Sequence, residues 1–254
     1  MSMTLSQRAD ELEHRMIREL DRKVVKSALF TSGECDPTGP FERPAAWDQP
    51  GAPRLFLMGD DPRLAKMPER PGLVDFFRLR FGPGASHHLL QSATHALKAG
   101  QSEKVVLACL LHDIAVAGFI RADHGYWGAQ LIEPYVDPEI TWAIRYHQAL
   151  RFFPDEAAGY SYPQTYRDWF GDDYRPEPYI EKAHRVARKH KWYMTSRLIT
   201  VHDIYAQDPH ARVRMEDFID IIGRNFRQPK AGLGFDGSPV AHMWRTMIWP
   251  TKFL

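Results

Sequence analysis

The feature that most constrains this chain is an apolar run, Val105–Leu111, that leads directly into the adjacent residues His112 and Asp113. Seven apolar residues in succession predict a buried helix, which we place at residues 105–115. Burying an imidazole and a carboxylate costs free energy unless a partner or a metal ion satisfies them. The run therefore predicts a helical core with a polar site inside it.

Further candidate metal ligands stand on both sides of this pair. His88 precedes it, and His124, His147 and Asp203 follow it, each within a stretch of helical apolar spacing. Neutral imidazole and carboxylate suit iron, manganese and zinc. With the central pair they make six groups, which is more than one ion with open coordination positions needs. Six groups are enough for two ions that share a bridging carboxylate.

Four short sequence motifs in this pattern resemble those of the HD-domain superfamily, whose signature is H…HD…D. They are His88-Leu89-Leu90-Gln91-Ser92-Ala93, Leu110-Leu111-His112-Asp113-Ile114, His124-x-x-x-Gly128-Ala129 and His147-x-x-x-Arg151. The two additional histidines resemble the binuclear branch of the superfamily. Within that branch the chain is similar to the mixed-valent diiron oxygenases, namely the aminophosphonate-cleaving HD oxygenases and, more distantly, myo-inositol oxygenase. The likeness covers roughly residues 75–210.

The resemblance implies an all-α HD-domain bundle around a two-metal site. It implies that Asp113 bridges both ions and takes part in catalysis. His88, His112 and Asp203 would complete the coordination of one ion, and His124 and His147 would bind the other. The implied cofactor is a pair of iron ions in the mixed-valent Fe(II)/Fe(III) state. Manganese, magnesium or another divalent metal is the alternative, because sites of histidine and aspartate also follow metal supply.

Arg151 is the candidate for contact with substrate. It follows His147 by four residues, so on a helix it lies one turn along the same face. An arginine beside two metal ions suits a phosphonate, phosphate or carboxylate on the substrate, and we assign it to substrate binding and catalysis. The alternative is an ordinary surface arginine.

Three neighbouring histidines are given lesser roles. The resemblance of the first motif, which runs from His88 to Ala93, selects His88 rather than His87 as the ligand. His95 lies on the same helical face as His88 and is expected in the core or behind the ligands, and His202 is the incidental neighbour of Asp203. Because a ligating histidine needs an acceptor for its second ring nitrogen, Gln91, Thr94 and His95 are candidates to support the ligands.

The function that the resemblance implies is an oxygenase that uses O2 to oxidise or cleave a small hydroxylated, anionic substrate of the organophosphonate or polyol type. A metal-dependent phosphohydrolase is the alternative, and a non-enzymatic HD module that binds a ligand or partner is a third hypothesis. Val116 stands three residues after Asp113, where many HD hydrolases and both of the similar kinds of oxygenase carry a polar residue. Valine cannot supply the acid that phosphoester cleavage uses. The segment Arg78–Gly84 also lacks the Tyr and Glu that precede the first ligand in the aminophosphonate enzymes.

The charge balance argues against two classes of partner. Lys and Arg number 33 and Asp and Glu number 32, so neither nucleic acid nor an anionic membrane surface is expected as a partner. The start of the chain has no signal-peptide core, and two cysteines, Cys35 and Cys109, exclude a disulfide framework. We expect a cytoplasmic enzyme whose partners are a small-molecule substrate and O2.

The chain divides into three parts by pattern. Residues 1–72 predict an N-terminal helix over 4–30 followed by a proline-rich wrap, 73–226 the HD domain, and 227–254 an aromatic-rich tail packed on it. The N-terminal helix also offers a surface for a homodimer. Residues 178–207 predict one long helix or two, with an apolar side that includes Tyr179, Val186 and Met194.

Overall fold

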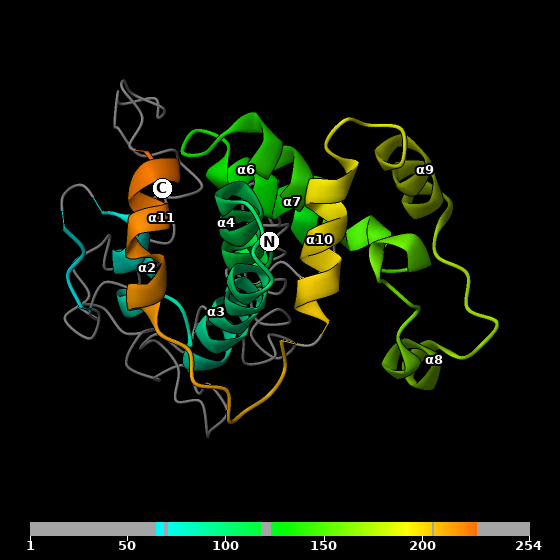
Figure 1. The fold of residues 1–254 in the computed structure, drawn as a ribbon, viewed down its shortest axis with the longest axis horizontal. Coiled ribbons are helices and arrows are strands. Elements are labelled where there is room, and N and C mark those ends of the chain that lie inside the picture. Colours follow the sequence, from blue (N-terminus) through cyan, green and yellow to red (C-terminus); the bar gives the residue numbers. More distant parts are fainter. Residues whose placement is uncertain (1–64, 69–70, 118–122, 205, 228–254) are drawn as a thin grey trace, which may run out of the picture.

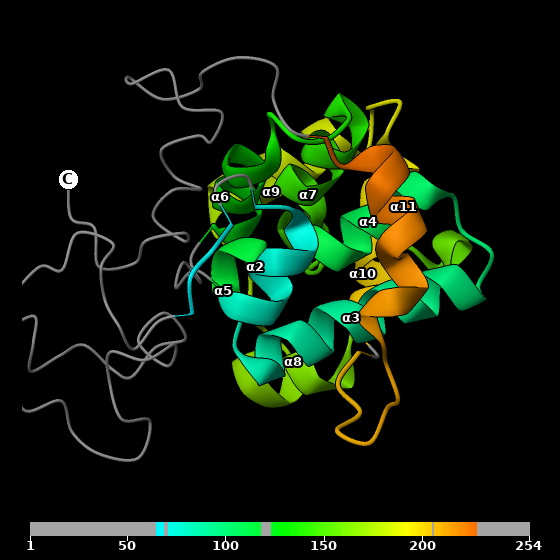
Figure 2. The same cartoon turned by 90° about the vertical axis from the view of Figure 1, so that its left-hand side faces the viewer.

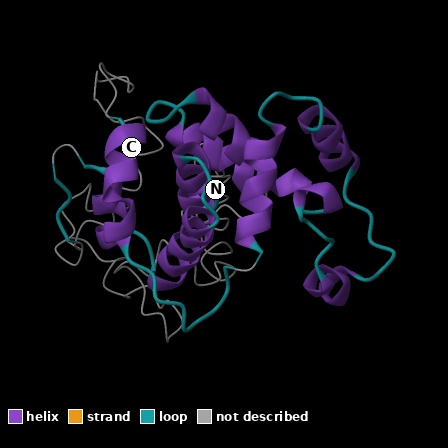
Figure 3. Cartoon of the chain, in the orientation of Figure 1, coloured by secondary structure: helices purple, strands orange, loops and turns teal. Residues whose placement is uncertain are grey.

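The structure is a computed structural model that describes residues 65–68, 71–117, 123–204 and 206–227. Helices, turns and one isolated bridge between Asp155 and Tyr160 make up this part of the chain, which contains no β-strand (Figure 3). The all-α fold class is thereby confirmed. Each helix in the described ranges is too short or too polar to span a lipid bilayer. The predicted helix at 4–30, most of the proline-rich wrap and nearly all of the tail lie outside the described residues.

Short helices follow one another along the described chain. In order they are α2 (Leu73–Leu79), α3 (Pro83–Lys98), α4 (Glu103–Leu111), α5 (Ile114–Ala117), α6 (His124–Ile132), α7 (Pro138–Leu150), the 3-10 helix η3 (Glu156–Ala158), α8 (Gln164–Phe170), α9 (Pro178–Ala187), α10 (Tyr193–Asp203), the 3-10 helix η4 (Met215–Phe218) and α11 (Ile219–Asn225).

Helix α4 lies at the centre of the bundle. Every residue from Val105 to Leu111 is buried, as a helix that is apolar on all sides requires. Helices α3, α7, α10 and α11 pack around it, and α6 packs against α7. Figures 1 and 2 show α2 and α11 on one flank of this group and α8 and α9 on the opposite flank. The helices that carry or adjoin the candidate ligands, α3, α4, α6, α7 and α10, therefore belong to one packed group.

Side-chain caps begin the helices α4 and α7. Ser102 caps α4 by accepting from the backbone N–H of Val105, and Asp137 caps α7 by accepting from that of Glu139. Helix α3 begins at Pro83, inside the Gly82-Pro83-Gly84 segment. Proline is favoured at the first helical position because its φ is already helical and its missing N–H has no helical partner there. The predicted helix at 105–115 is interrupted at the His-Asp pair itself, which separates α4 from α5.

The predicted apolar side of residues 178–207 was wrong in part. The segment forms two helices, but Tyr179, Val186 and Met194 are exposed. On α10 the polar residues Ser196 and Arg197 face the core instead, where the hydroxyl of Ser196 donates to the carbonyl oxygen of Ala143 at 2.8 Å. Polar side chains can occupy a core when neighbouring backbone groups satisfy them.

Candidate metal centre

Four imidazoles and two carboxylates from five separate segments meet inside the bundle. His88 comes from α3, His112 and Asp113 from the break after α4, His124 from α6, His147 from α7 and Asp203 from the end of α10. The structure thus brings together all six residues that the sequence marks as candidate ligands. All six are buried or nearly so.

The first group of donor atoms surrounds one oxygen of Asp203. This atom, Oδ1, lies 3.2 Å from His88 Nε2 and 3.3 Å from His112 Nε2. The two Nε2 atoms are 3.3 Å apart. Asp113 stands at the edge of the same group, with its Oδ2 at 3.6 Å from His88 Nε2 and its Oδ1 at 3.6 Å from His112 Nε2.

The second group also includes Asp113. Its Oδ1 lies 3.2 Å from His124 Nε2 and 3.5 Å from His147 Nε2, and those two nitrogens are 3.1 Å apart. Each group contains ligand atoms close enough together to hold one metal ion. Asp113 belongs to both, which is the arrangement that a bridging carboxylate requires.

Backbone carbonyls decide which ring nitrogen of three histidines faces the centre. The Nδ1 atoms of His88, His112 and His147 lie 2.8, 2.7 and 2.6 Å from the carbonyl oxygens of Ala206, Cys109 and Ile144. A carbonyl oxygen only accepts, so each Nδ1 carries the proton. In the neutral ring Nε2 then presents a lone pair to the centre. These carbonyls are the outer acceptors that ligating histidines need.

The resulting arrangement calls for a cation. The lone pairs of His88 Nε2 and His112 Nε2 cannot hydrogen-bond to each other, and Oδ1 of both Asp113 and Asp203 is buried without a hydrogen-bond donor. Donors bound to one ion at about 2.1 Å stand about 3.0–3.4 Å apart in octahedral or tetrahedral geometry. The observed separations of 3.1–3.6 Å are close to that range. The residues present therefore fit a pair of metal ions.

In a metal-free chain, protons have to compensate the two carboxylates. Burial lowers the pKa of His112, but Asp113 and Asp203 outweigh it and raise that pKa to about 9. Burial lowers the pKa of His147 to about 4 in spite of its contact with Asp113. Burial opposes ionisation of Asp113, yet His112, His147 and His124 hold its pKa well below the usual range. The centre thus keeps its carboxylates ionised and competes for cations.

Arg151 is not a surface arginine. Its Nη2 forms an ion pair with Asp203 Oδ2 at 2.7 Å, and its side chain is 20% exposed. The hydroxyl of Tyr160 donates to the Arg151 carbonyl oxygen at 2.8 Å. One oxygen of Asp203 therefore faces Arg151 while the other faces the imidazoles, so Arg151 holds this carboxylate in place.

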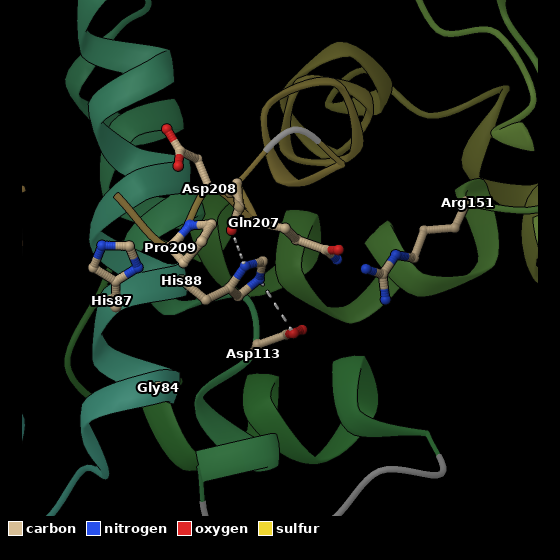
Figure 4. A pocket seen from close by; sticks show the side chains of 9 residues that line it. Gly84, His87, His88, Asp113, Arg151, Gln207, Asp208 and Pro209 are labelled. Carbon is tan, nitrogen blue, oxygen red and sulfur yellow. Dashed lines mark hydrogen bonds and ion pairs between the residues drawn. The ribbon is translucent and has the colours of Figure 1, made fainter. Parts of the chain in front are cut away.

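A cavity of about 390 Å³ opens beside the centre (Figure 4). His88, Asp113 and Arg151 line its inner part, together with Gly84, His87 and residues 206–209. The volume is in the range of small-molecule sites. Val116 is not among the residues that line this cavity, and the position three residues after Asp113 therefore supplies no acid to it.

The remaining candidates take other places. His87 Nε2 contacts the carbonyl oxygen of Ala211 at 3.0 Å, and His95 Nδ1 lies 3.3 Å from that of His202. Thr94 donates to Leu90 within its own helix. None of these three side chains supports a ligand directly. Sequence reasoning missed residues 206–209 in the cavity wall, because they follow the end of α10 and carry no periodic signal.

Gly125 allows α6 to approach α7. A Cβ added there would lie 2.8 Å from the carbonyl oxygen of Ile144 and 3.1 Å from that of Arg145. Gly125→Ala is expected to push α6 outward, to separate His124 from His147, and to cost about 1–3 kcal/mol of unfolding free energy. Metal content and denaturant unfolding check this prediction.

The matched control for this prediction is Gly223→Ala on α11, where an added Cβ meets nothing within 4 Å. This variant should keep the wild-type metal content and, if anything, gain stability, because alanine favours a helix over glycine. Wild-type metal content and stability in Gly125→Ala would contradict the close packing of α6 on α7.

Comparison with known proteins agrees with this geometry. Residues 86–163 match the family model described as HD domain. The chain contains an HD domain. The matched range holds five of the six candidate ligands, and the sixth, Asp203, reaches them because α10 packs against α3, α4 and α7.

One characterised relative is an oxygenase. The protein described as [1-hydroxy-2-(trimethylamino)ethyl]phosphonate dioxygenase (glycine-betaine-forming), from Leisingera caerulea, is 34% identical over an aligned stretch of 76 residues. That stretch covers 26% of this chain and 39% of the dioxygenase. The chain therefore matches well under half of the relative's length. Over this stretch it resembles an HD oxygenase.

Proposed function

We propose that this HD-domain chain is a diiron oxygenase that uses O2 to oxidise or cleave a small hydroxylated, anionic substrate of the organophosphonate or polyol type. The observation that carries the proposal is the pair of ligand groups joined by Asp113, with Arg151 beside them in a cavity of substrate size. The similarity to a phosphonate dioxygenase supports the same reaction class.

The division of labour follows from the positions of the side chains. His88, His112 and Asp203 would hold one iron, His124 and His147 the other, and Asp113 both. The irons would supply the activation of O2 and a Lewis-acid site for a substrate hydroxyl. Arg151 would orient an anionic group of the substrate through the guanidinium donors not directed at Asp203. The helices around the centre fix these directions and limit access of water.

The alternative activity is a metal-dependent phosphohydrolase. The same two metal sites would generate hydroxide for attack on a phosphoester. Such a reaction also needs a proton for the leaving group, and Val116 offers none. The cavity contains His87, whose Nε2 already contacts the Ala211 carbonyl oxygen. The oxygenase is therefore the function that the site supports better.

Oxygen uptake distinguishes the two activities. Iron-loaded protein is expected to consume O2 with 1-hydroxyalkylphosphonates or polyols, measured with an oxygen electrode, and to release no phosphate from nucleotides. Phosphate release from nucleotides without O2 uptake on any hydroxylated anion would overturn the proposal in favour of the phosphohydrolase.

Metal uptake is expected to displace a proton. His112, with a pKa of about 9 in the metal-free chain, is protonated near neutral pH, and its Nε2 must lose that proton before it can bind a cation. The apparent affinity for Mn²⁺ should therefore rise with pH until about pH 9, with release of about one proton per chain near neutral pH. Calorimetry in buffers of different ionisation enthalpy measures this release, and heats that are independent of the buffer would contradict it.

A further inference from the structure

The segment that follows α10 is fixed to α3 on both sides of Gln207. We call residues 206–209 the strap. The carbonyl oxygen of Ala206 accepts from His88 Nδ1 at 2.8 Å. Two residues later, the backbone of Asp208 forms two hydrogen bonds with the carboxamide of Gln91, each of 2.9 Å. Gln91 is 1% exposed, so these bonds form in the interior. The strap is thus held in one position relative to a candidate ligand.

Gln207 is the residue between these two attachments. Its side chain lies in the wall of the cavity with His88, Asp113 and Arg151. Figure 4 shows its carboxamide extended across the cavity toward the guanidinium of Arg151, above Asp113. Gln207 is exposed to solvent, and within the described part of the chain its carboxamide forms no hydrogen bond with protein. A fixed backbone therefore presents an unused amide to the space beside the metal centre.

The cation that faces this amide favours an oxyanion between the two, while the carboxylate of Asp113, which also lines the cavity, would be directed at the metal ions. Arg151 supplies a positive charge that Asp203 keeps in place at 2.7 Å. Asp208, the nearest strap carboxylate, is directed away from Arg151 (Figure 4) and accepts from the backbone N–H of His210 at 2.8 Å. An amide opposite a guanidinium offers a neutral N–H donor on one side and charged donors on the other.

We propose that Gln207 is a substrate-binding residue that holds an oxyanion, a phosphonate or a carboxylate, against Arg151. The substrate hydroxyl next to that anion would then face the metal centre. The substrate's reaction rests on the proposed function, whereas the anion clamp formed by Arg151 and Gln207 would serve either activity of this centre. Because Gln207 contacts no ligand, its replacement should change anion binding without changing metal content.

The test is titration of metal-loaded protein, prepared with Mn²⁺, with methylphosphonate and with acetate, followed by calorimetry. Gln207→Ala is expected to weaken binding of the anion by about tenfold or more, the loss typical of a hydrogen bond to a charged group. Gln207→Glu keeps the size of the side chain but places a carboxylate opposite the anion, so it should weaken binding further. Gln101→Ala, in the loop between α3 and α4, is the matched control and should bind the anions like the wild type.

Two further measurements separate a binding role from a structural one. Metal content and the denaturant midpoint should be equal in the wild type and both Gln207 variants. Added salt should lower the affinity of the wild type for the anion. The affinity of Gln207→Glu should fall less with salt, because this variant has already lost most of its anion binding. Anion binding that is unchanged in Gln207→Glu, or absent from the metal-loaded wild type, would overturn the clamp.

Failure of the clamp and failure of the oxygenase give different results. Anion binding that depends on Gln207, without O2 uptake, would leave the clamp standing and reject the oxygenase. O2 uptake with the same Michaelis constant in Gln207→Glu as in the wild type would leave the oxygenase standing and reject the clamp.

Discussion

Asp113→Asn is expected to remove both metal ions from the protein and to abolish its activity. Both groups of imidazoles depend on this one carboxylate, whose oxygens lie 3.2–3.6 Å from all four Nε2 atoms. Asparagine keeps the shape of the side chain but loses the negative charge and one of the two ligating oxygens. Loss of a supporting residue behind a ligand already costs about 10–100-fold in metal affinity or activity, so loss of the shared ligand should cost more.

Metal content after dialysis, together with turnover, measures this effect. Asp220→Asn removes an exposed carboxylate on α11 and serves as the control, with wild-type metal content and activity expected. Full occupancy by two ions in Asp113→Asn would show that the two groups do not share this residue.

Arg197→Met is expected to give the largest loss of stability among single substitutions outside the metal centre. Arg197 is fully buried on α10, where Nη1 donates to the carbonyl oxygen of Leu150 and Nη2 to that of Phe153, both at 3.0 Å. Its Nε donates to the hydroxyl of Tyr193 at 3.2 Å. Methionine fills much of the volume but leaves these buried acceptors without donors. Removing one side of such a buried charged network costs about 3–5 kcal/mol.

This substitution should also reach the metal centre. The two carbonyls that Arg197 holds flank Arg151, which in turn holds Asp203. Denaturant unfolding of the chelator-treated protein measures the stability term without a contribution from bound metal. Arg185→Met, which replaces an exposed arginine in an i,i+4 pair with Glu181, should change stability by less than about 0.5 kcal/mol. A loss equally small in Arg197→Met would contradict the assigned role.

The candidate ligands could be predicted from sequence because their motifs and spacing resemble those of the HD-domain superfamily, and because some of them also interrupt an apolar helical pattern. His112 and Asp113 follow seven buried apolar residues, and His147 occupies a buried position of α7. A polar side chain at such a position requires a partner, and several at related spacing indicate a common one. Arg151 was predicted to lie beside the centre by its spacing from His147, and its ion pair with Asp203 adds a role that spacing alone does not show.

The parts of the site that escaped prediction depend on backbone groups and on distant residues. The carbonyl oxygen of Ala206 orients His88 from a position 118 residues further along the chain. Every residue carries a carbonyl, so no sequence signal distinguishes this one. The burial of Arg197 was not predicted either, because helical periodicity assigns an arginine to the solvent side of a helix. The boundaries of the three predicted parts of the chain remain predictions.

The diiron centre is tested most directly by the metal content of protein expressed with iron, measured together with its low-temperature EPR spectrum after partial reduction with ascorbate. We expect about two irons per chain, bound by the two groups that share Asp113, and the signal of a coupled mixed-valent pair. A single ion per chain, or two ions that never give such a signal at any level of reduction, would contradict the assignment of this centre as a diiron oxygenase.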